Sequence, residues 1–255
     1  MTINRRSFLQ FSWLVALCAA MPAVSAESVR LKRILVYGDS NTFGWIYDPK
    51  VGVTRLPVEK TWVRVMADKL GAGYEVEVNA LGGRTICRDQ RTGIGTGSRI
   101  PGPLFNGMTS LPAVLSENLP LDLVIVMLGT NDAKAAFKTT ADQLADDLGR
   151  MTELIRGDGW GGNTPYPSPK VLLIAPIYQP DDTAYGEFFK GADAITKALP
   201  EALRRKAAEI GAEYLNAGDF VTGVPAQMDR VHMSEEQHRL LGLGAADKVK
   251  AIMER

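Results

Sequence analysis

The stretch Ile34-Leu35-Val36-Tyr37-Gly38-Asp39-Ser40-Asn41 decides the fold class, because a continuous apolar run passes directly into small polar residues. An apolar run of this length that ends in glycine is typical of a strand buried on both faces of a parallel sheet. The carboxyl ends of such strands are where open α/β sheets bind ligands. Ser40 and Asn41 are also common helix caps, so this stretch alone leaves both a capping residue and a reactive serine open.

Further stretches have the pattern of strands, and helical patterns alternate with them. Strands are expected at 32–37, 74–80, 121–128, 171–176 and 213–216, and helices at about 58–70, 108–117, 140–156, 185–210 and from 235 towards Met253. Residues 44–57 are expected to form a loop, and Pro200 to interrupt its helical stretch. The alternation predicts an α/β fold, a flavodoxin-like three-layer α/β/α sandwich on a five-stranded parallel sheet of order 2-1-3-4-5. In that order Ser40, Gly83 and Asn131 follow three adjacent strands and converge on one crevice.

The first 26 residues have the pattern of a secretory signal peptide. Arg5 and Arg6 precede an apolar run over 11–20, and Val24-Ser25-Ala26 supplies small residues for cleavage after Ala26. The arginine pair followed by Ser-Phe-Leu favours the twin-arginine route over the ordinary secretory route. We therefore expect a signal peptide over 1–26, one domain over 27–255, and a periplasmic or secreted protein.

Charge and cysteine content argue against several classes of function. The chain has 29 basic and 29 acidic residues, and signal removal takes away only Arg5 and Arg6, which leaves 27 − 29 = −2. A charge so near zero gives no electrostatic reason to bind nucleic acid or an anionic membrane. Cys87 is the only cysteine outside the signal, so an internal disulfide is impossible and a thiolate metal cluster is not expected. No metal or other cofactor is predicted.

A serine hydroxyl is a weak nucleophile and needs a positioned base. Outside the signal the chain offers two histidines, His232 and His238. His232 lies just before the last predicted helix, with Asp229 three residues upstream, near enough for a carboxylate to hold one ring nitrogen. His238 falls inside that helix, where a solvated or packing role is the default. We therefore predict Ser40 as nucleophile, His232 as base and Asp229 as its partner.

A tetrahedral intermediate also needs donors aimed at its oxyanion. Gly83 lacks a Cβ, so its backbone N–H can approach a ligand closely, and Asn131 carries a side-chain amide donor. A turn glycine and a helix cap are the simpler roles for these residues in isolation, and their placement beside Ser40 favours an oxyanion hole. Trp45 and Trp62 are candidates to line the pocket, although an aromatic residue near a strand end is more often part of the core.

Four blocks of the chain resemble those of the SGNH, or GDSL-type, serine hydrolase family. They are Gly38-Asp39-Ser40, Gly83, Gly129-Thr130-Asn131-Asp132 and Asp229-Arg230-Val231-His232, and the resemblance covers nearly the whole chain from Lys32. It implies a triad of Ser40, His232 and Asp229, and an oxyanion hole formed by the Ser40 and Gly83 N–H groups with the Asn131 side chain. No Gly-x-Ser-x-Gly elbow surrounds Ser40, which argues against the α/β-hydrolase alternative.

Within that family, the chain resembles the arylesterase branch, which includes acyltransferases and perhydrolases. The resemblance lies in residues 39–45, in 121–132 with Lys134 and Phe137, and in 166–170. The resemblance implies short acyl substrates, no metal, and assembly as a homo-oligomer in some members. The signal peptide and the glycine-rich segment Arg91 to Gly107 depart from that branch. Substrate and assembly therefore stay open.

The sequence thus predicts an exported serine esterase of short-chain aryl or alkyl esters that forms an acyl-enzyme, with acyltransferase or perhydrolase activity as an extension. A carbohydrate O-deacetylase with the same triad and a wider cleft is the enzymatic alternative. A non-catalytic flavodoxin-like binding protein, in which Ser40 is unreactive, is the alternative of another class. The expected partner is a small-molecule ester, with no nucleic acid and, after signal removal, no membrane.

Overall fold

The structure, a computed structural model, describes residues 30–48, 50–90 and 99–255. The predicted signal peptide over 1–26 and residues 91–98 of the segment Arg91 to Gly107 lie outside the described residues. The central sheet consists of parallel strands β1 (Lys32–Gly38), β4 (Tyr74–Ala80), β5 (Leu123–Met127), β6 (Lys170–Ala175) and β7 (Glu213–Asn216). Their spatial order, β4-β1-β5-β6-β7, confirms the predicted order 2-1-3-4-5.

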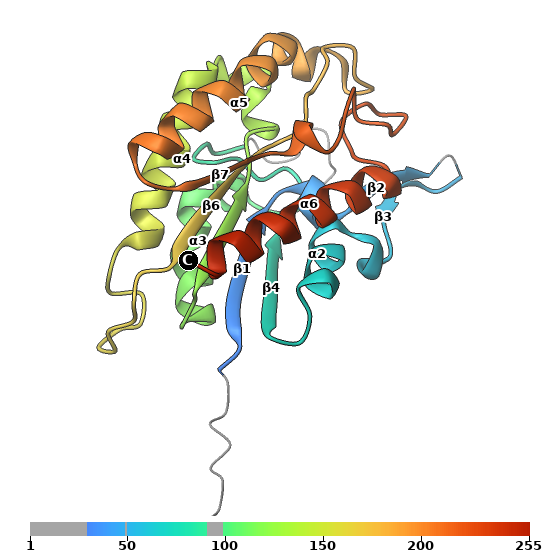
Figure 1. Cartoon of the computed structure of the whole chain (residues 1–255). Coiled ribbons are helices and arrows are strands. Elements are labelled where there is room, and N and C mark those ends of the chain that lie inside the picture. The colour runs from blue at the N-terminus through green and yellow to red at the C-terminus, as the bar shows by residue number, and fades with distance from the viewer. Residues whose placement is uncertain (1–29, 49, 91–98) are drawn as a thin grey trace, which may run out of the picture.

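Helices cover both faces of this sheet and complete the predicted three layers (Figure 1). One face carries α2 (Trp62–Leu70) and α6 (Glu235–Met253), and the other carries α3 (Gly107–Asn118), α4 (Ala141–Arg156) and α5 (Ala192–Glu209). Side chains alternate along β1: Leu35 and Tyr37 join the core under α3 to α5, whereas Ile34 and Val36 join the core under α2 and α6. The continuous apolar run of β1 therefore reflects burial on both faces. Within the described part of the chain, no helix combines the length and apolar character needed to cross a bilayer.

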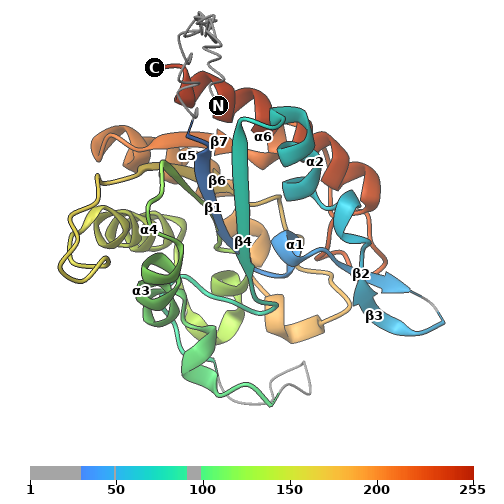
Figure 2. The same ribbon diagram turned by 90° about the horizontal axis from the view of Figure 1, so that it is seen from below.

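A two-stranded hairpin occupies the region predicted as a loop over 44–57. Strand β2 (Trp45–Asp48) pairs antiparallel with β3 (Gly52–Arg55), and the hairpin projects away from the main sheet (Figure 2). The prediction was wrong because these strands have only four residues each and are half-buried or exposed, so they lack the apolar alternation that marks a strand.

Pro200 does not interrupt α5, contrary to prediction. The helix runs from Ala192 to Glu209 with Pro200 inside it. Leu199, Ala202 and Leu203 beside the proline are buried against the sheet, and this packing offsets the backbone hydrogen bond that proline removes. The shorter elements are α1 (Ser40–Phe43), η1 (Val58–Lys60), η2 (Gly102–Phe105), η3 (Asn131–Ala133), η4 (Ala135–Phe137), η5 (Gly186–Phe189) and η6 (Ala217–Asp219).

Three neighbouring strands end at the same level of the sheet. Gly38, the last residue of β1, pairs with Ala80 of β4 and with Met127 of β5. The segments that follow these strands therefore start side by side at the carboxyl edge, where doubly wound sheets place their ligand sites.

Candidate active site

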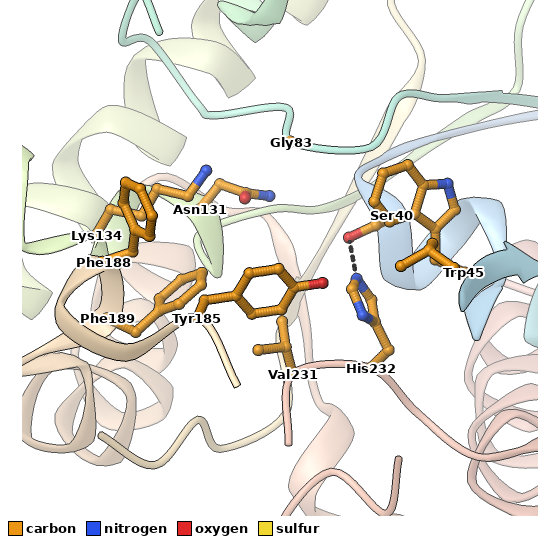
Figure 3. A pocket seen from close by; sticks show the side chains of 11 residues that line it. Ser40, Trp45, Gly83, Asn131, Lys134, Tyr185, Phe188, Phe189, Val231 and His232 are labelled. Carbon is orange, nitrogen blue, oxygen red and sulfur yellow. Dashed lines mark hydrogen bonds between the residues drawn. The ribbon is translucent and has the colours of Figure 1, made fainter. Parts of the chain in front are cut away.

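Ser40 begins the short helix α1 directly after β1. Asp39 caps this helix, and its Oδ1 accepts a hydrogen bond from the Asn41 N–H at 2.9 Å. Gly38 is needed before the cap because a Cβ at this position would collide with the Thr42 side chain. The chain thus turns sharply at the strand end, and Ser40, only 4% exposed, directs its hydroxyl into a cavity (Figure 3).

The loop before α6 brings His232 to this serine. Its Nε2 lies 2.9 Å from Ser40 Oγ (Figure 3), and its Nδ1 lies 2.6 Å from Asp229 Oδ2. Asp229 Oδ1 accepts the N–H groups of Val231 and His232, each at 3.0 Å. Burial raises the pKa of Asp229, but its hydrogen bonds and the nearby imidazole outweigh burial and hold the pKa below its ordinary value. This network assigns the proton of neutral His232 to Nδ1 and leaves Nε2 free to accept a proton from Ser40.

Asn41 ties the His232 loop to the serine. Its Oδ1 accepts the Met233 N–H at 3.0 Å, and its Nδ2 donates to the Val231 C=O at 3.2 Å. These bonds hold the residues on both sides of His232, and Asn41 is itself buried. Sequence reasoning treated Asn41 only as a possible cap, and its position next to the serine was the only signal that could have indicated this second role.

A capping box fixes the other side of the same loop. Ser234 accepts the Gln237 N–H at 3.3 Å, and the Gln237 side chain accepts the Ser234 N–H at 3.0 Å. Because α6 begins at Glu235, directly after its cap, the backbone beside His232 has a defined direction.

N–H donors gather on the cavity wall around Ser40. Gly83 adopts φ +88°, a conformation that favours glycine. The backbone N–H groups of Ser40 and Gly83 donate no hydrogen bond to any residue that the structure describes. The Asn131 amide lines the same cavity and donates to the Arg84 C=O at 3.1 Å. The structure thus brings Ser40, Gly83 and Asn131 together as predicted, in an arrangement that suits an anionic oxygen.

Buried charges lie beneath the site. The Arg84 guanidinium stacks on the Tyr37 ring, 4.0 Å from its centroid, and donates to the Gly38 C=O at 3.0 Å and the Asn79 C=O at 2.7 Å. It therefore ties the end of β1 to the end of β4. Burial raises the pKa of Asp39 to about 6, although the Asn41 N–H and the neighbouring cationic groups lower it. Within 30–48, 50–90 and 99–255, no three His, Cys, Asp or Glu side chains are grouped to hold a metal ion.

The cavity in front of Ser40 is small and mostly apolar, with a volume of about 150 Å³. The residues that line it are Ser40, Trp45, Val53, Gly83, Asn131, Lys134, Tyr185, Phe188, Phe189, Val231 and His232. A cavity of roughly this volume holds benzene in another protein, so the space suits a short acyl or an aryl group.

Comparison with known proteins places this arrangement in a family. The chain matches the model of the GDSL-like lipase/acylhydrolase family over residues 36–240. It belongs to this family. The predicted resemblance is thereby confirmed, and the protein is a carboxylic ester hydrolase of the SGNH type.

Solved structures of esterases share this fold. A carbohydrate acetylesterase from Sinorhizobium meliloti is 34% identical with a TM-score of 0.77, and the match covers 87% of this chain and 99% of that chain. The M. smegmatis aryl esterase is 33% identical with a TM-score of 0.77, covering 86% and 99%. A carbohydrate acetylesterase family member from Sinorhizobium meliloti is 28% identical with a TM-score of 0.76, covering 88% and 100%. A comparison with curated proteins found no match.

The two tryptophans that were candidates to line the pocket of this esterase lie in different places. Trp45, on β2, lines the cavity with its ring centroid 5.7 Å from that of His232. Trp62 does not line it, and this prediction was wrong. Trp62 is fully buried at the start of α2, in the core between the sheet and the α2 and α6 helices. The apolar face of its helix, and not its distance from a strand end, determines its position.

Sequence reasoning missed most of the esterase's pocket wall. Val53 reaches the cavity from the hairpin, and Tyr185, Phe188 and Phe189 reach it from the segment around η5. None of these residues belongs to a motif block. The one available signal was the cluster of aromatic residues over 185–189, which the helical interpretation of 185–210 absorbed.

Proposed function

We propose that this esterase hydrolyses short-chain aryl or alkyl esters, with Ser40 as nucleophile, His232 as general base and Asp229 as the group that orients the imidazole. The observation that carries the proposal is the unbroken chain of contacts from Asp229 Oδ2 through His232 to Ser40 Oγ, at 2.6 and 2.9 Å, in the wall of a small cavity. A serine with such partners is activated where an isolated serine is not.

The reaction then has two halves. As Ser40 Oγ bonds to the ester carbonyl carbon, its proton moves to His232 Nε2 and the carbonyl electron pair moves to oxygen. The C–O bond to the alcohol breaks as the imidazolium protonates the departing oxygen, which leaves an acyl-enzyme. Water repeats these steps and releases the acid. The low pKa of Asp229 keeps its carboxylate charged beside the imidazolium throughout.

Hydrogen-bond donors near Ser40 can stabilise the oxyanion of the tetrahedral intermediate. The N–H groups of Ser40 and Gly83, which have no acceptor among the described residues, and the amide of Asn131 support an oxyanion hole in which charge develops against fixed dipoles. Transfer of the acyl group to an alcohol or to a peroxide uses the same acyl-enzyme, and we propose it as an extension of the activity.

Two of the similar structures named above are carbohydrate acetylesterases, which favours sugar acetates as a second candidate substrate class. An acetyl group fits the cavity, and the sugar would lie towards its mouth. The volume of about 150 Å³ supports short acyl groups for either class. We propose aryl and simple alkyl esters first because the cavity wall is largely aromatic and aliphatic.

Covalent labelling with a fluorophosphonate tests the nucleophile, with hydrolysis of a panel of aryl acetates, butyrates and octanoates alongside. We expect Ser40→Ala to abolish labelling and to lower turnover on the order of 10⁴-fold. Full hydrolysis by purified Ser40→Ala protein would overturn the mechanism, and an unlabelled wild type would favour the non-catalytic binding protein. Higher kcat/KM on acetylated xylose than on aryl acetates would assign the carbohydrate deacetylase instead.

We also propose that the esterase is exported by the twin-arginine route and assembles as a homo-oligomer. The pair Arg5 and Arg6 before an apolar run supports export. Replacing both by lysine should retain the protein in the cytoplasm in cell fractionation, and export of this variant at the wild-type level would argue for the ordinary secretory route.

Light scattering after gel filtration measures the mass of the assembly, and the mass of a monomer would contradict the proposed homo-oligomer.

A further inference from the structure

Lys134 places an ammonium group in the wall of the substrate cavity. It follows the η3 turn, and its backbone N–H donates to the Asn131 C=O at 3.4 Å. Residues three apart in such a turn lie on the same face, on the order of 6 Å from each other. Both side chains accordingly line the cavity, and Figure 3 shows them together on the side away from His232.

This ammonium lacks a counter-ion within the described residues. Its Nζ donates to Gln90 Oε1 at 3.0 Å and lies 5.9 Å from the centroid of the Phe189 ring. Two acidic groups act on it electrostatically, but each is engaged elsewhere: Asp132 pairs with Arg88 at 3.0 Å, and Asp39 caps α1.

Burial removes water from the Lys134 ammonium and disfavours its charged form. Desolvation lowers the pKa of Lys134 to about 8, although Asp132 and Asp39 raise it. The group is therefore mostly charged at pH 7, and an anion entering the cavity would replace the water that the ammonium has lost. Gln90 also fixes the neighbouring loop, because its Nε2 donates to the Gly83 C=O. The ammonium is thus held in a defined position relative to the oxyanion donors.

We propose that Lys134 binds a carboxylate carried by the ester substrate, a few bonds from the carbonyl that Ser40 attacks. The inference rests on the proposed function of the site and names its substrate class: esters of short dicarboxylic acids, or short acyl esters of carboxylate-bearing alcohols. Phe188 and Phe189 line the cavity beside Lys134 and would cover the connecting carbons. A carboxylate there gains a charge-assisted hydrogen bond that a neutral ester cannot form.

Matched ester pairs test this selectivity. The first pair differs by a carboxylate in the acyl part: phenyl hydrogen succinate and its neutral isostere phenyl 4-oxopentanoate. The second pair differs by a carboxylate in the alcohol part: 4-acetoxybenzoate and its neutral isostere 4-acetoxyacetophenone. The measured quantity is the ratio of kcat/KM between charged and neutral ester. We expect Lys134→Met to lower this ratio roughly 10- to 100-fold for one of the two pairs, which also identifies the side that carries the charge.

Lys190→Met is the matched control, because Lys190 is an exposed lysine paired with Glu187 next to η5. It should leave the ratio unchanged. An unchanged ratio for both pairs in Lys134→Met, or an equal fall on charged and neutral esters, would overturn the inference. The proposed function fails separately, through the labelling of Ser40, so a labelled enzyme without charge selectivity contradicts only the role of Lys134.

A second test measures the same kcat/KM ratio in the wild type as a function of pH, so it does not depend on the folding of a variant. In the wild type the ratio should fall as pH rises through about 8, where Lys134 loses its proton. Asp39, Asp132, His232 and Tyr185 also face this region. A change in turnover with pH that is common to the charged ester and its neutral isostere cancels in the ratio. A ratio that stays constant from pH 7 to pH 9 would exclude an ammonium as the recognising group.

Discussion

His232 and His238 are only six residues apart and both are buried, yet their surroundings are opposite. His232 has a carboxylate on one ring nitrogen and the Ser40 hydroxyl on the other. His238 accepts the Trp62 N–H on Nδ1 at 3.2 Å, and its Nε2 has no partner in the described part of the chain. Burial, with a smaller contribution from the charge of His232, lowers the pKa of His238 to about 4. A buried imidazole suits proton transfer only where an anion stabilises its charged form.

The backbone explains the difference. His232 lies in a loop at the carboxyl edge of the sheet, where it borders the cavity, whereas His238 lies on the inner face of α6. Trp62 is the first residue of α2, and the N–H groups of a first helical turn have no partner inside the helix. His238 supplies that partner from α6. His232 is therefore placed beside Ser40 Oγ, as the proposed mechanism requires, and His238 joins two helices.

Replacing each histidine in turn tests whether only His232 is needed for turnover. We expect His232→Ala to lower kcat for an aryl acetate on the order of 10⁴-fold, because the variant loses the ring nitrogen that contacts Ser40 Oγ and that we propose takes its proton. His238→Asn should keep turnover close to wild type, since the asparagine Oδ1 can still accept the Trp62 N–H. Steady-state kinetics on both purified variants checks this. Loss of turnover in His238→Asn with its retention in His232→Ala would reverse the assignment.

The sequence was sufficient for the sheet and for the approach of Ser40 to His232. β1 and β5 are buried on both faces, so burial left long apolar runs that could be recognised, although β5 is shorter than the predicted 121–128. The sequence favoured His232 as the proposed base because only two histidines lie outside the signal, and His232 precedes the last predicted helix whereas His238 falls inside it.

The pocket wall could not be predicted, because it depends on contacts between segments without a motif. Val53 and Phe188 remain 46% and 43% exposed in the folded protein, so burial imposes no apolar period on their neighbours in sequence. The misplacement of Trp62 has the same origin: nearness to the catalytic loop in sequence does not say which layer a side chain enters.

Asn41 sharpens the comparison, because it holds His232 in place and has no counterpart at His238. Asn41→Leu keeps most of the volume but leaves the Val231 C=O and the Met233 N–H buried without partners, at a cost of about 1–3 kcal/mol each. The loop should shift, and a misplaced base should lower kcat roughly 10- to 100-fold with little change in KM.

Asn118→Leu is the control for this change. Asn118 donates to the Val114 C=O at 2.8 Å on α3, where it does not line the cavity, so its loss should cost stability without lowering kcat. Wild-type kcat in Asn41→Leu would show that the capping box alone is enough to position His232. Equal losses in both variants would indicate a general effect of lower stability.

The smallest effect is a change in acid stability. Native His238 stays neutral down to a pKa of about 4, whereas the unfolded chain takes up a proton near the ordinary value of 6.5. The stabilisation it provides is therefore complete above pH 6.5 and is lost as pH falls towards 4. Between pH 7 and pH 4.5 this amounts to about 2 kcal/mol of the unfolding free energy.

His238→Asn removes this titration and leaves every other group in place. Urea unfolding at pH 7 and pH 4.5 should therefore show a loss of stability that is about 2 kcal/mol smaller in the variant than in the wild type. Asp39 and Asp132, whose pKa values are raised to about 6 and about 7, act in both proteins, so their contributions cancel in this difference. Equal losses in the two proteins would mean that His238 is already protonated in the native state at pH 4.5. The contrast with His232 would then rest on position alone and no longer on the pKa of the buried ring.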